Sequence, residues 1–200
     1  MRKFISGMIL GAGASQRFGE PKQLLPYAGT TLLGWVVSQT QQALALDEVV
    51  LVLGRSADEI RARVDFGAAK VVENPVFTEG CASSYRAGIA AIDSCSEAIM
   101  IILGDQPGIT PEIINTLAGE WRQSNAPIAL CSYEDRKGHP MIFARSLFDQ
   151  LEVLHGDKAA WKLVDAHAAL VHVVQLSLPF PEDINTREDF ERLAPVGTND

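Results

Sequence analysis

The chain has 200 residues, of which 47% are hydrophobic and 21% are charged, a balance typical of a globular protein and not of a disordered or fibrous one. Its 17 Lys and Arg residues against 25 Asp and Glu give a formal charge of -8, which argues against nucleic acid as a partner. The longest apolar runs are far shorter than the roughly 20 residues that span a bilayer, so we expect no membrane partner. One domain over residues 1–200 is expected.

Strand-length apolar runs alternate with helix-length amphipathic segments along the chain. Strands are predicted at residues 4–10, 48–53, 70–73, 98–103, 127–132, 141–143 and 170–176. Helices are predicted at residues 31–46, 56–64, 82–93, 110–124, 145–154, 158–167 and 187–193, with Ser56 and Thr110 as N-caps. This alternation predicts a three-layer α/β/α sandwich with a mostly parallel sheet. Ligands in such sheets bind beyond the carboxyl ends of strands, so residues that follow strands are the functional candidates.

The first predicted strand leads into a loop of small residues that is followed by two cations. Small residues let a ligand approach the backbone, whose N–H groups bind phosphate oxygens. Gln16 and Phe18 stand where a dinucleotide fingerprint and a P-loop would each need glycine, so neither motif is present. The alternative is a flexible surface loop with solvated cations. The nucleotide-binding candidates here are Leu10, Gly11, Ala12, Gly13, Arg17 and Lys22.

The stretch from Leu10 to Gly19, followed by residues 21–26, resembles the signature loop of the nucleotidyltransferase superfamily. It is most similar to molybdenum cofactor cytidylyltransferases and their guanylyltransferase relatives, whose pattern is roughly LAAGxSxRxG, then K and LL. The resemblance implies a Rossmann-like nucleotide-diphospho-sugar transferase fold, with Arg17 and Lys22 on the phosphates of an NTP. Ala12 matches the cytidylyl branch, where guanylyl relatives usually carry glycine, and therefore favours CTP.

Two carboxylates are candidates for a Mg²⁺ site. Asp105 and Gly104 directly follow the strand predicted at 98–103, within a phrase, LGDQP, that is similar to the metal-binding motif of the same family. A late segment resembles the family phrase DIDTPEDY, with Asp183 as its first aspartate and Asn185 in place of the second. The resemblance implies that Asp105 and Asp183 hold Mg²⁺ and that Gly104 adjoins the nucleotide. The alternative for each aspartate is a turn or capping residue.

Two further phrases supply candidates for nucleotide and acceptor binding. Ser83 and Ser84 lie in a stretch similar to the family pattern G-x-x-S-S-x-x-x-G, at the start of a predicted helix where they would donate to the nucleotide. The alternative is a helix cap with small residues for tight packing. His139 lies in a phrase that resembles the family's GHPVLF, and we expect it either to contact the acceptor or to order its loop.

Residues 156–161 depart from the family, because cytidylyltransferases usually read GDxGAR there. Ala159 takes the place of the second glycine and Trp161 that of the arginine. Tryptophan has one N–H donor and a large apolar face, so we expect a more helical segment and a less cationic acceptor pocket. The alternative is that Lys158 restores the charge while Trp161 packs in the core. The acceptor-binding candidates are His139, Asp157, Lys158 and Trp161.

These phrases occur in family order, and together they imply Mg²⁺-dependent transfer of CMP from CTP to molybdopterin with release of pyrophosphate. Arg17, Lys22 and Asp105 are the catalytic candidates, acting through positioning and charge. One alternative is a related transferase for another phosphorylated acceptor, such as a sugar phosphate. Another is a non-catalytic nucleotide-binding assembly factor for molybdoenzymes. A molybdoenzyme that receives the product is an expected partner.

Cysteine usage bears on the cellular compartment. Cys81, Cys95 and Cys131 are scattered without CxxC spacing, too few for a disulfide scaffold. We expect reduced thiols that pack as small apolar residues, and a cytoplasmic location.

Overall fold

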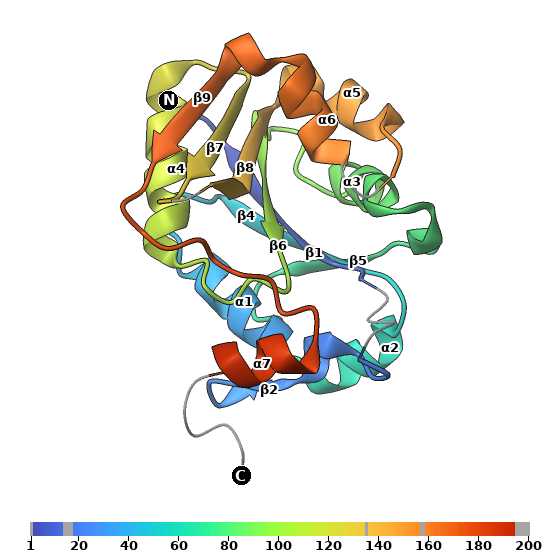
Figure 1. The fold of residues 1–200 in the computed structure, drawn as a ribbon. Coiled ribbons are helices and arrows are strands. Elements are labelled where there is room, and N and C mark those ends of the chain that lie inside the picture. Colours follow the sequence, from blue (N-terminus) through green and yellow to red (C-terminus); the bar gives the residue numbers. More distant parts are fainter. Residues whose placement is uncertain (1, 14–17, 135, 157–158, 195–200) are drawn as a thin grey trace.

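The computed structural model describes residues 2–13, 18–134, 136–156 and 159–194. A seven-stranded sheet runs through this part of the chain in the order β5-β4-β1-β6-β8-β7-β9 (Figure 1). Its strands are β1 Ile5–Gly11, β4 Glu48–Leu53, β5 Lys70–Glu73, β6 Ala98–Leu103, β7 Ile128–Ser132, β8 Lys137–Ala144 and β9 Val171–Gln175. A separate two-stranded sheet pairs β2 Pro26–Tyr27 with β3 Thr30–Thr31.

The large sheet is mostly parallel, as the sequence predicts, and β8 is its exception. β8 pairs antiparallel with both β6 and β7, whereas the other neighbouring strands are parallel. The connection between β7 and β8 is short, and only an antiparallel pair can be closed by so few residues. The strand predicted at 141–143 therefore extends over Lys137–Ala144 as the second arm of a hairpin.

Helices cover both faces of the sheet and confirm the three-layer sandwich (Figure 1). One face carries α1 Leu32–Gln41, α2 Ala57–Arg63 and α4 Pro111–Ser124, and the other carries α3 Cys81–Ile89, α5 Phe148–Val153 and α6 Ala159–Ala166. Along β6, Met100 and Ile102 belong to the first core, and Ile99 and Ile101 belong to the second. This alternation follows from the two-residue period of a strand buried on both sides. A further helix, α7 Arg187–Leu193, packs through Phe190 against the small sheet.

The helix ends differ in part from those predicted. Thr110 caps α4 as expected, because its Oγ1 accepts a hydrogen bond from the backbone N–H of Ile113 at 3.4 Å. Ser56 occupies the N-cap position of α2 as predicted, but its φ is 69° and its side chain makes no capping hydrogen bond. The helix predicted at 31–46 ends at Gln41, where the N–H of Ala43 bonds to the carbonyl of Thr40 in a tighter turn.

Cys81, Cys95 and Cys131 form no disulfide bond, but they do not share one environment. Cys131 is buried and Cys81 is half-buried, whereas Cys95 is exposed. The expected packing role is therefore wrong for Cys95. Within the described ranges, no helix is both long and apolar enough to cross a bilayer.

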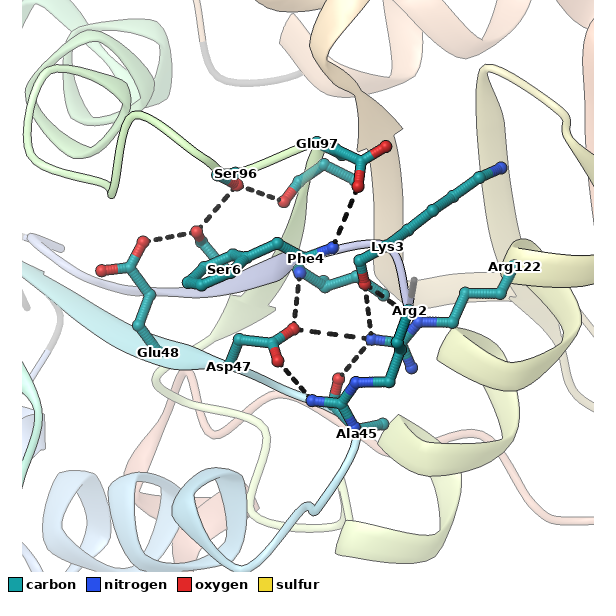
Figure 2. Close-up of polar contacts among 12 residues, drawn as sticks. Arg2, Lys3, Phe4, Ser6, Ala45, Asp47, Glu48, Ser96, Glu97 and Arg122 are labelled. Carbon is teal, nitrogen blue, oxygen red and sulfur yellow. Dashed lines mark hydrogen bonds and ion pairs between the residues drawn. The ribbon is translucent and has the colours of Figure 1, made fainter.

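A polar network joins the amino ends of β1, β4 and β6 (Figure 2). Asp47 pairs with Arg122 across 3.6 Å. Glu48 Oε1 accepts a hydrogen bond from the Ser6 hydroxyl at 2.5 Å, and that hydroxyl lies 2.8 Å from the hydroxyl of Ser96. These contacts fasten three parallel strands at one edge of the sheet, so their carboxyl ends meet in a fixed arrangement at the other edge.

Candidate functional site

The candidate site lies where the chain reverses its direction across the sheet. From β1 the chain adds β4 and β5 on one side and then crosses to place β6 on the other. The loops after β1 and β6 diverge there and leave a crevice, which is the usual ligand position in such sheets. A cavity of about 720 Å³ occupies this crevice. Its lining includes Leu10, Gly11, Ala12, Gly13, Lys22, Arg55, Ser84, Gly104 and Asp105.

The glycine loop is held in the crevice by close backbone contacts. A Cβ at Gly104 would lie 2.9 Å from the carbonyl oxygen of Leu10, and one at Gly54 would lie 2.8 Å from that of Ala12. Both positions therefore require glycine for the loops to approach each other. The amide nitrogen of Gln23 donates to the carbonyl oxygens of Gly11 and Gly13, each at 3.0 Å. These contacts fix the described part of the loop around the cavity.

Lys22 reaches two segments that are far from it in sequence, one after β6 and one before α7. Its Nζ lies 2.6 Å from Asp105 Oδ2 and donates to the carbonyl oxygen of Ile184 and to Asn185 Oδ1, each at 3.0 Å. The Lys22 side chain is 12% exposed and that of Asp105 is 24% exposed, so solvent only partly screens this pair. The cation predicted for the triphosphate thus also holds the two candidate carboxylate segments together.

Asp183 is placed by the segment that enters α7. Ile184 is fully buried, and its N–H bonds to the carbonyl oxygen of Asp105 at 2.9 Å. Thr186 and Asp189 form a capping box that fixes the start of α7. Burial raises the pKa of Asp183, and the nearby negative charge of Asp105 raises it further.

This donor set fits a divalent metal. The negative charge of Asp105 disfavours that of Asp183, and a cation bound beside them would offset this repulsion. Carboxylate oxygens are the ligands that Mg²⁺ and Mn²⁺ take. Within the described residues, no cluster of three or more His, Cys, Asp or Glu residues is arranged to hold a metal. Asp105 and Asp183 therefore suit an ion that also takes oxygen ligands from a bound triphosphate.

A second cavity of about 270 Å³ adjoins the first and shares Leu10, Cys81 and Leu103 with it. Its other lining residues are Tyr85, Gln106, His139, Ala160, Trp161, Phe180 and Asp183. His139 lies on β8 and not in a loop, and its ring is edge-on to Trp161 with centroids 6.4 Å apart. Burial lowers the pKa of His139 to about 4, which keeps the imidazole neutral at physiological pH.

The other predicted site residues differ in where the structure places them. Ser84 lines the first cavity. Ser83 is 2% exposed, and its hydroxyl accepts from the amide of Asn74 and donates to the carbonyl of Gly80 within the fold. The structure therefore supports the packing alternative for Ser83. Arg17, Asp157 and Lys158 lie outside the described residues.

Three residues of the site were not predicted from the sequence. Arg55 follows β4 and lines the first cavity. Its position after a predicted strand could have identified it as a candidate. Gln23 holds the glycine loop, and Gln106 donates from its amide nitrogen to Asp183 Oδ1 at 2.5 Å. Both glutamines lie inside recognisable phrases, but the polar contacts that give them a role depend on the tertiary fold.

The glycine loop, the carboxylates of Asp105 and Asp183 and the lysine that links their segments define an α/β protein of the nucleotidyltransferase class. The chain belongs to the MobA-like NTP transferase domain family, whose model matches residues 7–171. The resemblance seen in the sequence is thereby confirmed.

Curated relatives of the chain have several activities. Nicotine blue oxidoreductase of Paenarthrobacter nicotinovorans is 33% identical over 94% of this chain and 96% of its own length. A probable molybdenum cofactor guanylyltransferase of Thermococcus kodakarensis is 27% identical over 97% of this chain and 96% of its own. The molybdenum cofactor cytidylyltransferase of Escherichia coli is 25% identical over 70% of each chain.

Solved structures agree with the fold. The crystal structure of Rv0371c from Mycobacterium tuberculosis matches with a TM-score of 0.88 and 37% identity, over 96% of this chain and 98% of that one. Its complex with manganese matches with a TM-score of 0.83 and 35% identity, over 97% of this chain and 99% of that one. A close relative thus takes a divalent metal.

Proposed function

We propose that this protein transfers CMP from CTP to a phosphorylated acceptor, molybdopterin, and releases pyrophosphate, with Mg²⁺ as cofactor. The observation that carries the proposal is the contact of Lys22 with Asp105 at a cavity that the glycine loop also lines. The family and its molybdenum cofactor relatives support the reaction class. Cytoplasmic location and delivery of product to a molybdoenzyme belong to the same proposal.

In this reaction an oxygen of the acceptor phosphate attacks the α-phosphorus of CTP, and the bond from that phosphorus to the pyrophosphate oxygen breaks. Residues Gly11, Ala12 and Gly13 bind the nucleotide through their backbone, and Lys22 offsets phosphate charge. Asp105 and Asp183 would hold the metal, which supplies charge neutralisation when bound. The protein needs no nucleophile of its own, because the acceptor brings one.

A pyrophosphate-release assay tests this proposal. The protein is given each of the four common NTPs with Mg²⁺, against molybdopterin and a panel of sugar phosphates. The proposal expects release that depends on both CTP and molybdopterin. Release with a sugar phosphate alone would support the related transferase instead. NTP binding without any release would support the non-catalytic assembly factor.

Base selectivity gives a separate prediction. Ala12 lines the nucleotide cavity at a position where the guanylyl relatives usually carry glycine, and we propose that its methyl group leaves less room for a purine base. We therefore expect a KM for CTP at least about tenfold below that for GTP, since such a contact is worth roughly 1–3 kcal/mol. The Ala12→Gly variant should lose most of this preference. Equal or better use of GTP by the unaltered protein in the same assay would contradict the prediction.

Trp161 is predicted to determine acceptor preference. It lines the second cavity from α6, which begins at Ala159 as the departure from the family pattern suggested. Trp161→Arg adds a bidentate cation and removes an aromatic wall, so the KM for molybdopterin should change by about tenfold. The KM for CTP should stay within about twofold, because Trp161 does not line the first cavity. An unchanged KM for the acceptor would show that Trp161 acts only in packing.

A second candidate function is reduction of a planar aromatic compound. The likeness to nicotine blue oxidoreductase, which extends over almost all of both chains, favours it, as do the aromatic walls of the second cavity. The hydride would come from a reduced nicotinamide cofactor bound in the first cavity. Consumption of NADH or NADPH in the presence of nicotine blue tests this candidate, and no consumption of either contradicts it.

A further inference from the structure

Gln106 lies between the two cavities and contacts a residue of the candidate metal site. It directly follows Asp105, is 1% exposed and lines the second cavity together with Asp183. Its amide nitrogen lies 2.5 Å from Asp183 Oδ1. A carboxylate oxygen only accepts hydrogen bonds, so this contact fixes which end of the amide faces Asp183.

The other end of the amide is unsatisfied. Gln106 Oε1 is buried, and no described residue donates a hydrogen bond to it. His139 Nε2, from another residue that lines the second cavity, is also buried without a partner in the described chain. Buried polar atoms are nearly always hydrogen-bonded, so two such atoms around one cavity point to a ligand that supplies the missing partners.

The lining of the second cavity restricts the chemistry of that ligand. Tyr85, Trp161 and Phe180 give it aromatic walls, and none of its described lining residues is a lysine or an arginine. Among these described residues a phosphate group would find no cation, whereas Lys22 and Arg55 both line the first cavity. A flat, neutral ring suits the aromatic walls.

We propose that Gln106 is a positioning and specificity-determining residue that couples the two cavities. Its amide N–H holds Asp183, and its Oε1 accepts a hydrogen bond from an N–H group of a neutral, planar nitrogen heterocycle in the second cavity. The further statement that this heterocycle is part of the acceptor rests on the proposed function. Occupying the second cavity then fixes the amide and, through it, the carboxylate of Asp183, so heterocycle and metal strengthen each other's binding.

The first test uses the unaltered full chain and does not require catalysis. Mn²⁺ binding is measured by electron paramagnetic resonance, with and without saturating 6-hydroxymethylpterin, a pterin that carries no phosphate. We expect the pterin to tighten Mn²⁺ binding about fivefold, and Mn²⁺ to tighten pterin binding by the same factor. A pterin methylated at its ring N–H and exocyclic amino group should bind about tenfold more weakly. Absence of pterin binding, of this coupling or of the methylation effect overturns the proposal.

The second test uses Gln106→Met, which keeps the length of the side chain and removes both the oxygen and the nitrogen of the amide. Pterin affinity should fall about tenfold and the coupling to Mn²⁺ should disappear, while CTP affinity should stay within about twofold. Gln41→Met is the matched control, because it removes the hydrogen bond that the Gln41 side-chain amide donates to the carbonyl oxygen of Phe66, and Gln41 lines neither cavity. Loss of Mn²⁺ affinity with unchanged pterin affinity in Gln106→Met, or equal losses in Gln41→Met, would overturn the proposal.

The proposed transfer reaction and the proposed role of Gln106 are distinguished by different measurements. If the coupling is present but no acceptor leads to pyrophosphate release, the proposed transfer is wrong and the role of Gln106 as a coupling residue stands. If release occurs with molybdopterin but the coupling is absent, the transfer stands and the role of Gln106 is wrong. The binding measurements on the unaltered chain test the coupling between pterin and Mn²⁺ even if Gln106→Met does not fold.

Discussion

Asp105→Asn is expected to lower kcat by at least about a hundredfold and to leave the fold intact. The substitution keeps the shape of the side chain and removes the negative charge that faces Lys22 and the candidate metal position. Losing one placed electrostatic group at a reaction centre typically has an effect of this size. The neutral amide still offers an oxygen to Lys22, so Tm should fall by no more than about 4 °C, which corresponds to about 1 kcal/mol in a chain of this length. Steady-state pyrophosphate release and a thermal unfolding curve measure the two quantities.

Asp149→Asn provides the control for this prediction. Asp149 is an exposed aspartate in the first turn of α5 and lines neither cavity. The same chemical change there should leave kcat within about twofold, as expected for a surface position away from the site. Near-normal turnover in Asp105→Asn would reject Asp105 as a residue of the reaction centre. A large loss of Tm together with activity would assign it a structural role instead.

The positions of the candidate residues after β1 and β6 were predictable, because they follow from where buried strands end. The apolar run before Gly104 predicts a central strand, and a strand at that place puts Asp105 at the mouth of the sheet. The same reasoning places Gly11 and Gly13, and it would also have selected Arg55, which follows β4. Strand ends are predictable from local sequence since a strand buried on both faces has few polar side chains.

The contacts that give the site its geometry were not predictable in the same way. Lys22 meets Ile184 and Asn185 across more than 160 positions of sequence, and no local pattern encodes such a pairing. Ser83 illustrates the opposite case: a residue type that suits nucleotide binding is turned inward to Asn74 by the packing of α3. Spacing predicts which residues reach the crevice, and packing then decides which way their side chains face.

Lys22→Met is expected to separate the two roles that the structure gives this residue. The variant keeps most of the aliphatic stem and loses the ammonium group, which contacts Asp105, Ile184 and Asn185. Without that charge on the triphosphate, kcat/KM for CTP should fall by about a hundredfold. The free energy of unfolding should fall by about 1 to 2 kcal/mol, because a partly buried ion pair and two further hydrogen bonds are lost.

The metal affinity of Lys22→Met should change in the opposite direction to its activity. In the unaltered protein the ammonium group lies 2.6 Å from Asp105 Oδ2 and competes with a cation for that carboxylate. Removing it should tighten Mn²⁺ binding in the absence of NTP by about tenfold, as one nearby unit charge at the surface of a protein is worth a few kcal/mol before screening. Arg63→Met, which breaks an exposed ion pair with Glu59, is the control and should change neither quantity by more than about twofold. Lowered stability of Lys22→Met with unchanged kcat/KM and unchanged Mn²⁺ affinity would mean that Lys22 only holds the segments at Asp105 and Ile184 together.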